Sequence, residues 1–69
     1  MSTFTAIVHQ EDEWYVAECP ELGTASQGKS VEEAIANLRE ATALYLEEFP
    51  REQHVSRPIL ATFDVPVHA

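Results

Sequence analysis

The sequence is poor in the residues that usually stabilise very small proteins. Its 69 residues include a single cysteine, Cys19, which excludes an internal disulfide. Neither C-x-x-C nor H-x-x-x-H spacing occurs, so a structural zinc site is not expected. A domain of this size buries only about 60% of the surface of its unfolded chain. We therefore expect one domain over residues 1–69 that gains stability as a homodimer or homotetramer, and a lone thiol that suits the reducing cytoplasm.

Basic residues are scarce and long apolar runs are missing. Four Lys and Arg stand against twelve Asp and Glu, which gives a formal net charge of −8. Such a surface repels nucleic-acid phosphates and anionic lipid, whereas it attracts a basic protein by long-range steering. No apolar run is long enough to span a bilayer, and the first residues alternate in polarity where a signal peptide would be continuously apolar. The balance predicts a protein-binding role without direct binding to nucleic acid or membrane.

The spacing of apolar residues predicts four strands. Residues 3–10 alternate in polarity, and residues 14–18 are aromatic and β-branched, so the two form a hairpin around an acidic turn. Residues 24–27 are a short third candidate. Alternation returns after Pro58 and predicts a fourth strand with one apolar face, made of Ile59, Ala61, Phe63, Val65 and Val67.

The stretch between the third and fourth strands predicts a helix. Ser30 is a good N-cap, and Glu33 three residues later completes a capping box, while Pro50 ends the helix. An apolar stripe recurs at spacings of three and four, in Ala34, Ile35, Leu38, Ala41, Tyr45 and Phe49. The resulting β-β-β-α-β order predicts an α+β fold of two layers, one helix packed on a four-stranded mixed sheet. The other face of this sheet has little within the chain to cover it.

The sequence "GTASQGKS", residues 23–30, matches the phosphate-loop pattern G-x-x-x-x-G-K-[ST]. A phosphate loop follows directly on a buried strand, but four residues separate Gly23 from the strand before it. A turn at Gly23, a short strand, a turn at Gly28 and a cap at Ser30 account for every residue. We interpret the match as an accident and expect no cofactor.

No pair of side chains has the spacing of a catalytic or metal site. In a hairpin that turns at Asp12, Cys19 and His9 lie on the order of 15 Å apart, too far for a nucleophile and its base. The run from Glu11 to Glu13 lacks the spacing and glycine of a calcium loop. We therefore expect a protein that is not an enzyme, with no catalytic, cofactor-binding or metal-binding residues.

Two aromatic residues and the acidic turn are candidates for binding a partner. Trp14 and Tyr15 occupy adjacent strand positions and point to opposite faces, so only one packs under the helix. The other is exposed or covered by a partner, and aromatic residues dominate binding hot spots. The candidate partner-binding residues are Glu11, Asp12, Glu13, Trp14 and Glu21; for the acids, an ordinary solvated role is the alternative.

Residues 15–41 resemble the HicB-like antitoxin family of bacterial toxin–antitoxin modules. The likeness begins with a Y-x-A-x-x-P-x-L-G hairpin exit that starts at Tyr15, followed by Gly28 and the cap at Ser30. The helix then matches E-E-A-x-x-N-x-x-E-A from Glu32 to Ala41. The resemblance implies a partial RNase-H-like fold without catalysis, and a role in neutralising HicA, a small basic RNA-cleaving toxin, by covering its active site.

The chain departs from the family in its C-terminal part. Full-length family antitoxins carry a helix-turn-helix or ribbon-helix-helix segment, whereas this sequence stops directly after its last predicted strand. We expect a solo N-terminal-type domain without the DNA-binding segment. A stand-alone structural homo-oligomer of the same family, with no toxin partner, is the alternative; a residual enzyme or nucleotide binder is a third hypothesis.

Overall fold

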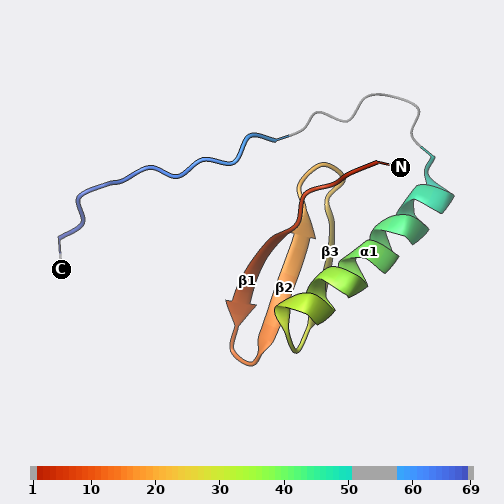
Figure 1. Cartoon of the computed structure of the whole chain (residues 1–69), viewed down its shortest axis with the longest axis horizontal. Helices are drawn as coiled ribbons and strands as arrows, with labels where there is room; N and C mark the ends of the chain where they lie inside the picture. The colour runs from red at the N-terminus through yellow and green to blue at the C-terminus, as the bar shows by residue number, and fades with distance from the viewer. Residues whose placement is uncertain (1, 51–57, 69) are drawn as a thin grey trace.

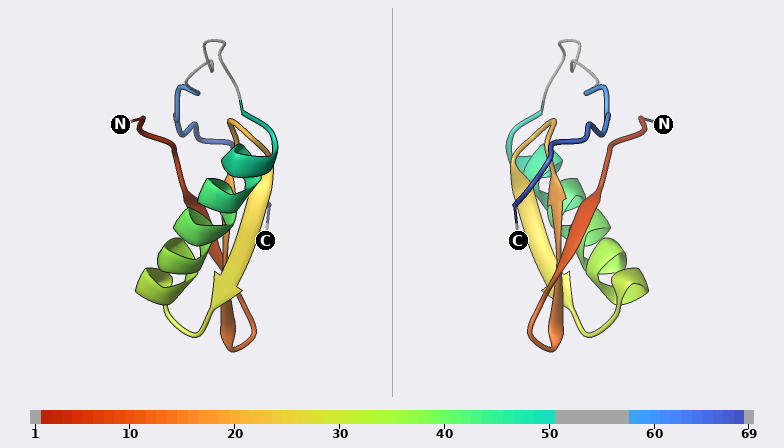
Figure 2. Two further views of the ribbon diagram at one scale, coloured as in Figure 1. Left: turned by 90° about the vertical axis from the view of Figure 1, so that its right-hand side faces the viewer. Right: turned by 90° about the vertical axis from the view of Figure 1, so that its left-hand side faces the viewer.

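A three-stranded antiparallel sheet and one helix make up the body of the protein (Figure 1). The computed structural model describes residues 2–50 and 58–68. The helix lies across one face of the sheet (Figure 2), so the predicted two-layer α+β plan is confirmed. The elements are β1 (Ile7–Glu11), β2 (Trp14–Cys19), β3 (Thr24–Gly28) and α1 (Val31–Glu48).

The two turns of the sheet contain the backbone conformations that L-residues rarely adopt. Glu11 pairs with Trp14 across a two-residue turn, in which Asp12 has a φ of 56°. Aspartate tolerates this left-handed conformation better than most residues. Gly23 has a φ of 81°, and its N–H donates to the carbonyl of Cys19 at 2.7 Å. The predicted acidic turn and glycine turn are both confirmed.

β1 begins later than the alternation predicts. The ladder joins Ile7 to Glu18 and continues to the hairpin turn, but residues 3–6 form no strand. Extending the same register would place Thr5 opposite Pro20, which has no N–H to donate. The N–H of Thr5 donates instead to the side chain of Glu21. The alternation therefore overestimates the length of the first strand, because the strand that pairs with it is followed by a proline.

The helix begins as the sequence predicts. Ser30 has extended backbone angles, and its hydroxyl accepts the N–H of Glu33 at 3.0 Å. The carboxylate of Glu33 accepts the N–H of Lys29, one residue before the N-cap that a capping box normally reaches. At the other end, the N–H of Phe49 donates to the carbonyl of Tyr45 at 2.8 Å, directly before the proline expected to end the helix.

Small residues bring the helix close to the sheet. The buried apolar residues are Ala17 and Cys19 of β2 and Ala34 and Leu38 of α1. At Gly28 a Cβ atom would lie 2.7 Å from the backbone nitrogen of Ala34, so glycine is needed for this approach. Half-buried Phe4, Val8, Tyr15 and Leu22 pack around this centre.

Polar contacts also join α1 to β3. The hydroxyls of Thr24 and Thr42 are 2.8 Å apart, and Thr42 is buried. Asn37 donates its side-chain amide to the carbonyl of Gln27 at 2.8 Å. Because α1 packs chiefly on β3 and β2 and touches β1 little, the β1 side of the sheet is left uncovered by the helix.

The predicted fourth strand is not formed. Residues 58–68, here called the C-terminal segment, are extended and belong to no strand, and they lie away from the body (Figure 1). Ile59, Phe63 and Val67 are 93%, 86% and 85% exposed. Alternation indicates an extended conformation with an apolar face, but it does not determine the edge with which a strand pairs. The expected four-stranded mixed sheet is therefore a three-stranded antiparallel sheet here. Residues 51–57, between the helix and this segment, lie outside the described residues.

Candidate functional site

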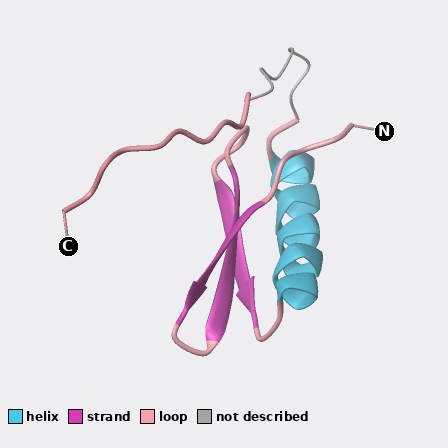
Figure 3. Ribbon diagram, turned by 60° about the vertical axis from the view of Figure 1, so that its left-hand side comes forward, coloured by secondary structure: helices cyan, strands magenta, loops and turns pink. Residues whose placement is uncertain are grey.

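Carboxylates gather where the β1–β2 turn and the start of α1 lie at the same end of the molecule (Figure 3). The turn is acidic because three consecutive acids fill it, and the helix begins with two more in its first turn, where the helix dipole favours negative charge. All five residues are exposed. We call this surface the acidic end; its residues are Glu11, Asp12, Glu13, Glu32 and Glu33.

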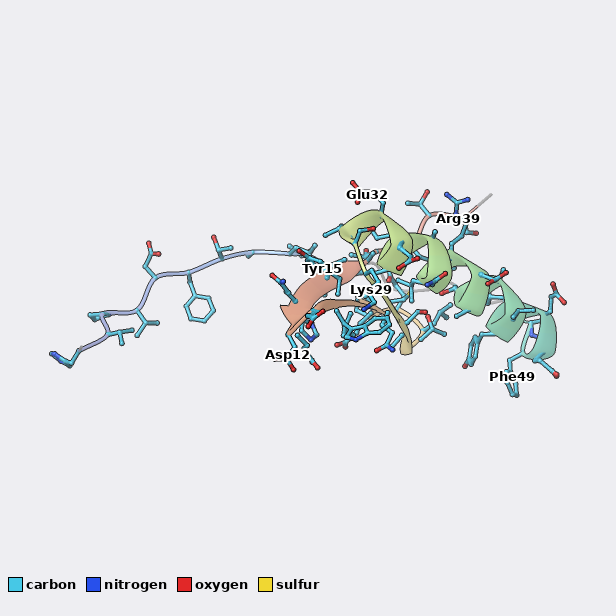
Figure 4. The ribbon with its side chains drawn as sticks, turned by 90° about the horizontal axis from the view of Figure 1, so that it is seen from below. Asp12, Tyr15, Lys29, Glu32, Arg39 and Phe49 are labelled. Carbon is cyan, nitrogen blue, oxygen red and sulfur yellow. The ribbon has the colours of Figure 1, made fainter. Side chains whose placement is uncertain are left out.

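An aromatic side chain and a lysine lie beside these acids. Trp14 is 39% exposed, and the ammonium of Lys29 lies 4.3 Å from its ring centroid, within the range of a cation–π contact. Figure 4 shows Lys29 and Asp12 in the same half of the molecule, away from Phe49 at the end of α1. Because Lys29 precedes α1, the contact ties the hairpin to the start of the helix. Tyr15 packs against the core on the opposite face, which confirms the predicted separation of the two aromatics.

Lys29 is the residue of this surface that the sequence did not reveal. In the sequence it stands out only as the lysine of the apparent phosphate loop. In the structure, the residues between Gly23 and Lys29 form β3, which pairs with β2 along its whole length. The turn at Gly23, the strand and the cap at Ser30 predicted as the alternative are thus found, whereas Gly28, which was expected in a turn, is the last residue of β3. The distance of fifteen positions between Trp14 and Lys29 gave no signal of their contact, which depends on the pairing of β2 with β3.

Glu21 lies at the far end of β2 from the acidic end. Its carboxylate accepts the N–H of Thr5 at 3.0 and 3.1 Å to its two oxygens, and the hydroxyl of Thr5 at 2.8 Å. The thiol of Cys19 donates to it at 3.4 Å. Partial burial raises the pKa of Glu21, but the hydrogen bonds from Thr5, from the backbone of Glu21 itself and from Cys19 together outweigh it and hold this pKa below its ordinary value. Among the five candidate residues, the structure therefore brings together Glu11, Asp12, Glu13 and Trp14, and places Glu21 in a contact that fastens the N-terminal segment.

A groove of about 330 Å³ opens on the other side of the helix, beside the residues that lead into β1. Its wall is mainly apolar, and Arg39 is its one basic residue among those described. The sequence places Ile35 and Leu38 in the apolar stripe, but it does not show that both border a groove. The groove is lined chiefly by Phe4, Ala6, Ile35, Leu38, Thr42 and Leu46.

The structure also bears on metal and membrane binding. Within residues 2–50 and 58–68, no three His, Cys, Asp or Glu side chains are grouped so that they could hold a metal ion. His9 contacts Glu11 at 2.9 Å, and both side chains are well exposed, so this pair contributes little to stability. No helix in the described part of the chain is long and apolar enough to cross a bilayer.

Comparison with known proteins identifies relatives over most of the chain. A UPF0150 protein of Helicobacter pylori is 41% identical over 49 residues, which cover 70% of this chain and 68% of the relative. A UPF0150 protein of Synechocystis is 38% identical over 65 residues, which cover 81% of this chain and 82% of the relative. No family model matches the chain, and no solved structure matches it. At this identity and coverage, the chain belongs to the UPF0150 family.

Proposed function

We propose that this protein is an antitoxin-like protein-binding module of the HicB type, which neutralises a small basic RNA-cleaving toxin similar to HicA. The observation that carries the proposal is the acidic end, where exposed carboxylates gather at the same end of the molecule as an exposed tryptophan. Charge of one sign steers a partner of the other sign, and an exposed aromatic residue beside the charges provides buried contact area after docking. The resemblance over residues 15–41 gives the partner its class.

The proposed action needs no chemistry of the protein's own. A module that covers the active site of a toxin inhibits it by occlusion, and we propose that the chain acts in this way and is not an enzyme. An RNase-H-type site would need a carboxylate in the middle of the first strand. The middle residues of β1 are Val8, His9 and Gln10, which supply none.

We also propose that the complete fold is the partial RNase-H-like β-β-β-α-β arrangement, with the C-terminal segment as its fourth strand. Support comes from the apolar alternation of that segment and from the side of the sheet next to β1 that the helix leaves uncovered. We place the protein in the bacterial cytoplasm, where a buried free thiol such as Cys19 stays reduced.

The first experiment is to isolate the tagged protein from its own cells at low salt and identify what accompanies it. We expect a small basic protein that is lost as the salt concentration rises, because screening weakens contacts between exposed charges. Recovery of this protein alone at every salt concentration would contradict the proposal.

Charge-neutralising variants then locate the contact. The triple variant Glu11→Gln, Asp12→Asn, Glu13→Gln should bind the captured partner roughly tenfold more weakly, since each exposed charge contributes about 0.2–1 kcal/mol. The loss should be mainly in the association rate. The matched control removes the same charge elsewhere on the exposed surface of α1, with Glu40→Gln, Glu47→Gln and Glu48→Gln. Equal weakening by both triples would show that only net charge matters, and would refute the acidic end as the contact surface.

A stand-alone structural homo-oligomer is the second candidate function. The observation that favours it is the exposure of large apolar side chains along the C-terminal segment, among them Ile59, Phe63 and Val67. A genome neighbourhood without a small basic reading frame, together with a defined oligomer in solution, would favour this candidate over the antitoxin.

A further inference from the structure

We propose that two copies of this protein exchange their C-terminal segments, so that residues 58–68 of each chain fill the groove beside β1 of the other. This inference rests on the fourth strand proposed above and does not depend on the basic partner. In the dimer, the C-terminal segment of one copy fills the groove of the other and pairs with the edge of its sheet, so that the apolar side chains of the segment become buried.

The β1 side of the body has space and an unpaired edge. The strand order is β1-β2-β3, so β1 pairs on one side only. The helix packs chiefly on β3 and β2, and the groove lies beside the residues that lead into β1, between Phe4 and Ala6 on one side and Ile35 and Leu46 of the helix on the other. An unpaired edge beside an apolar groove is a template for one further strand.

The C-terminal segment has the matching chemistry and length. Its odd-numbered residues, from Ile59 to Val67, are all apolar. An extended chain of this length spans about 35 Å. This is comparable with the length of residues 2–11, which comprise β1 and the residues before it. In one strand the side chains and the backbone N–H groups alternate together. Odd residues that point into the groove therefore turn their N–H groups to one common edge of the segment, and the direction in which the segment runs decides whether that edge faces β1.

Pro66 is an even-numbered residue, and its position selects the direction in which odd residues face β1. Proline is tolerated on an edge strand where its missing N–H faces solvent. With odd residues bonded to β1, Pro66 lies on the outer edge, together with Leu60, Thr62 and Asp64. The added strand thus ends the sheet with an edge that lacks one donor and carries one charge, which discourages further pairing.

The occupant is a second copy because the segment is clear of its own groove. It extends beyond β1, on the side away from α1 (Figures 1 and 3), and its apolar residues are exposed. Exchange between two copies is reciprocal and closed, as in most homodimers. Burying four large apolar side chains of each segment and the groove surface that they cover removes roughly 1,000–2,000 Å² from solvent in the dimer. Stable protein interfaces bury about 1,200–2,000 Å².

The first test compares two lysine substitutions at neighbouring positions. Phe63→Lys puts a charge on the groove-facing parity, whereas Thr62→Lys puts the same charge on the outer edge. By analytical ultracentrifugation we expect the parent protein and Thr62→Lys to have twice the mass of one chain, and Phe63→Lys to dimerise at least tenfold more weakly. A parent protein that is monomeric at all concentrations, or equal effects of the two variants, would overturn the proposal.

The second test separates exchange from folding back. In a 1:1 mixture of ¹³C-labelled and unlabelled protein, isotope-filtered NOE spectra detect only contacts between chains. We expect such contacts from the Phe63 ring to the methyl groups of Ile35 and Leu46; if these contacts arise only within one chain, exchange is wrong and the segment docks on its own body. Amide exchange should be slow at Ala61 and Phe63 and fast at Thr62, and the reverse pattern would refute the assigned parity.

Discussion

Replacing Gly28 with alanine tests whether the helix packs so closely on the sheet that no side chain fits between them. A Cβ atom at this position would lie 2.7 Å from the backbone nitrogen of Ala34 and 2.9 Å from the carbonyl carbon of Glu33. Both are backbone atoms of the first helical turn, so they cannot rotate aside as the end of a side chain can. The helix must move away from the sheet, or the end of β3 must move away from the helix.

We expect Gly28→Ala to lower the free energy of unfolding by about 1–3 kcal/mol, the usual cost of overpacking a filled site. In a domain of this size each kcal/mol corresponds to about 4–8 °C in Tm. Urea unfolding followed by far-UV circular dichroism, at one fixed protein concentration, measures the change. The concentration must be fixed because self-association would add to apparent stability.

Gly23 provides the matched control. It has a φ of 81° and nothing within 4 Å of an added Cβ, so alanine there costs only the left-handed conformation, about 1–2 kcal/mol. Asparagine adopts this conformation more readily than alanine. At Gly23, asparagine should therefore be milder than alanine, whereas at Gly28 the larger side chain should be worse. The same ranking at both positions, or a change below about 0.5 kcal/mol for Gly28→Ala, would refute the steric argument.

Three further substitutions test individual contacts. Ser30→Ala should cost about 1 kcal/mol of unfolding free energy in urea titrations, because it removes the N-cap acceptor; no change would mean that the cap is dispensable. The pKa of Glu21 is lower folded than unfolded, so its contact with Thr5 stabilises the protein above the ordinary glutamate pKa and is lost as pH falls through the folded pKa. The stability difference between the parent and Glu21→Gln should therefore shrink toward zero in acid, and a difference independent of pH would contradict this. Thr42→Val should lower the free energy of unfolding by about 1–3 kcal/mol because it leaves the hydroxyl of Thr24 without its hydrogen-bond partner. The double variant with Thr24→Val should recover part of this loss. Effects that simply add would show that the two hydroxyls are not coupled.

The local features of this fold could be predicted from the sequence because their causes are local. The helix start needs only Ser30 and the acid three residues later, and the glycine turn needs only a residue that accepts positive φ at Gly23. The hairpin follows from an alternating run and an aromatic, β-branched run on either side of a short acidic turn. The opposite orientation of Trp14 and Tyr15 follows from strand geometry alone.

What the sequence did not reveal depends on pairing between distant positions. The contact of Thr5 with Glu21 spans sixteen positions and exists because Pro20 cannot continue the ladder. The stacking of Lys29 on Trp14 depends on the register of β2 with β3. For the same reason, the alternation predicted that the C-terminal segment is extended, but it did not predict which strand the segment pairs with.

The order of elements in the body has a consequence for the rate of folding. β1 pairs with β2, β2 with β3, and β3 packs with α1, so the main contacts join neighbours in the sequence. Loops between neighbours are short and close quickly, and proteins built from such contacts fold fast. The body therefore needs no contribution from residues 58–68 to reach its shape, and can form while the chain is still being synthesised. Exchange of the C-terminal segments is then a later, bimolecular step, whose rate rises with the concentration of finished chains.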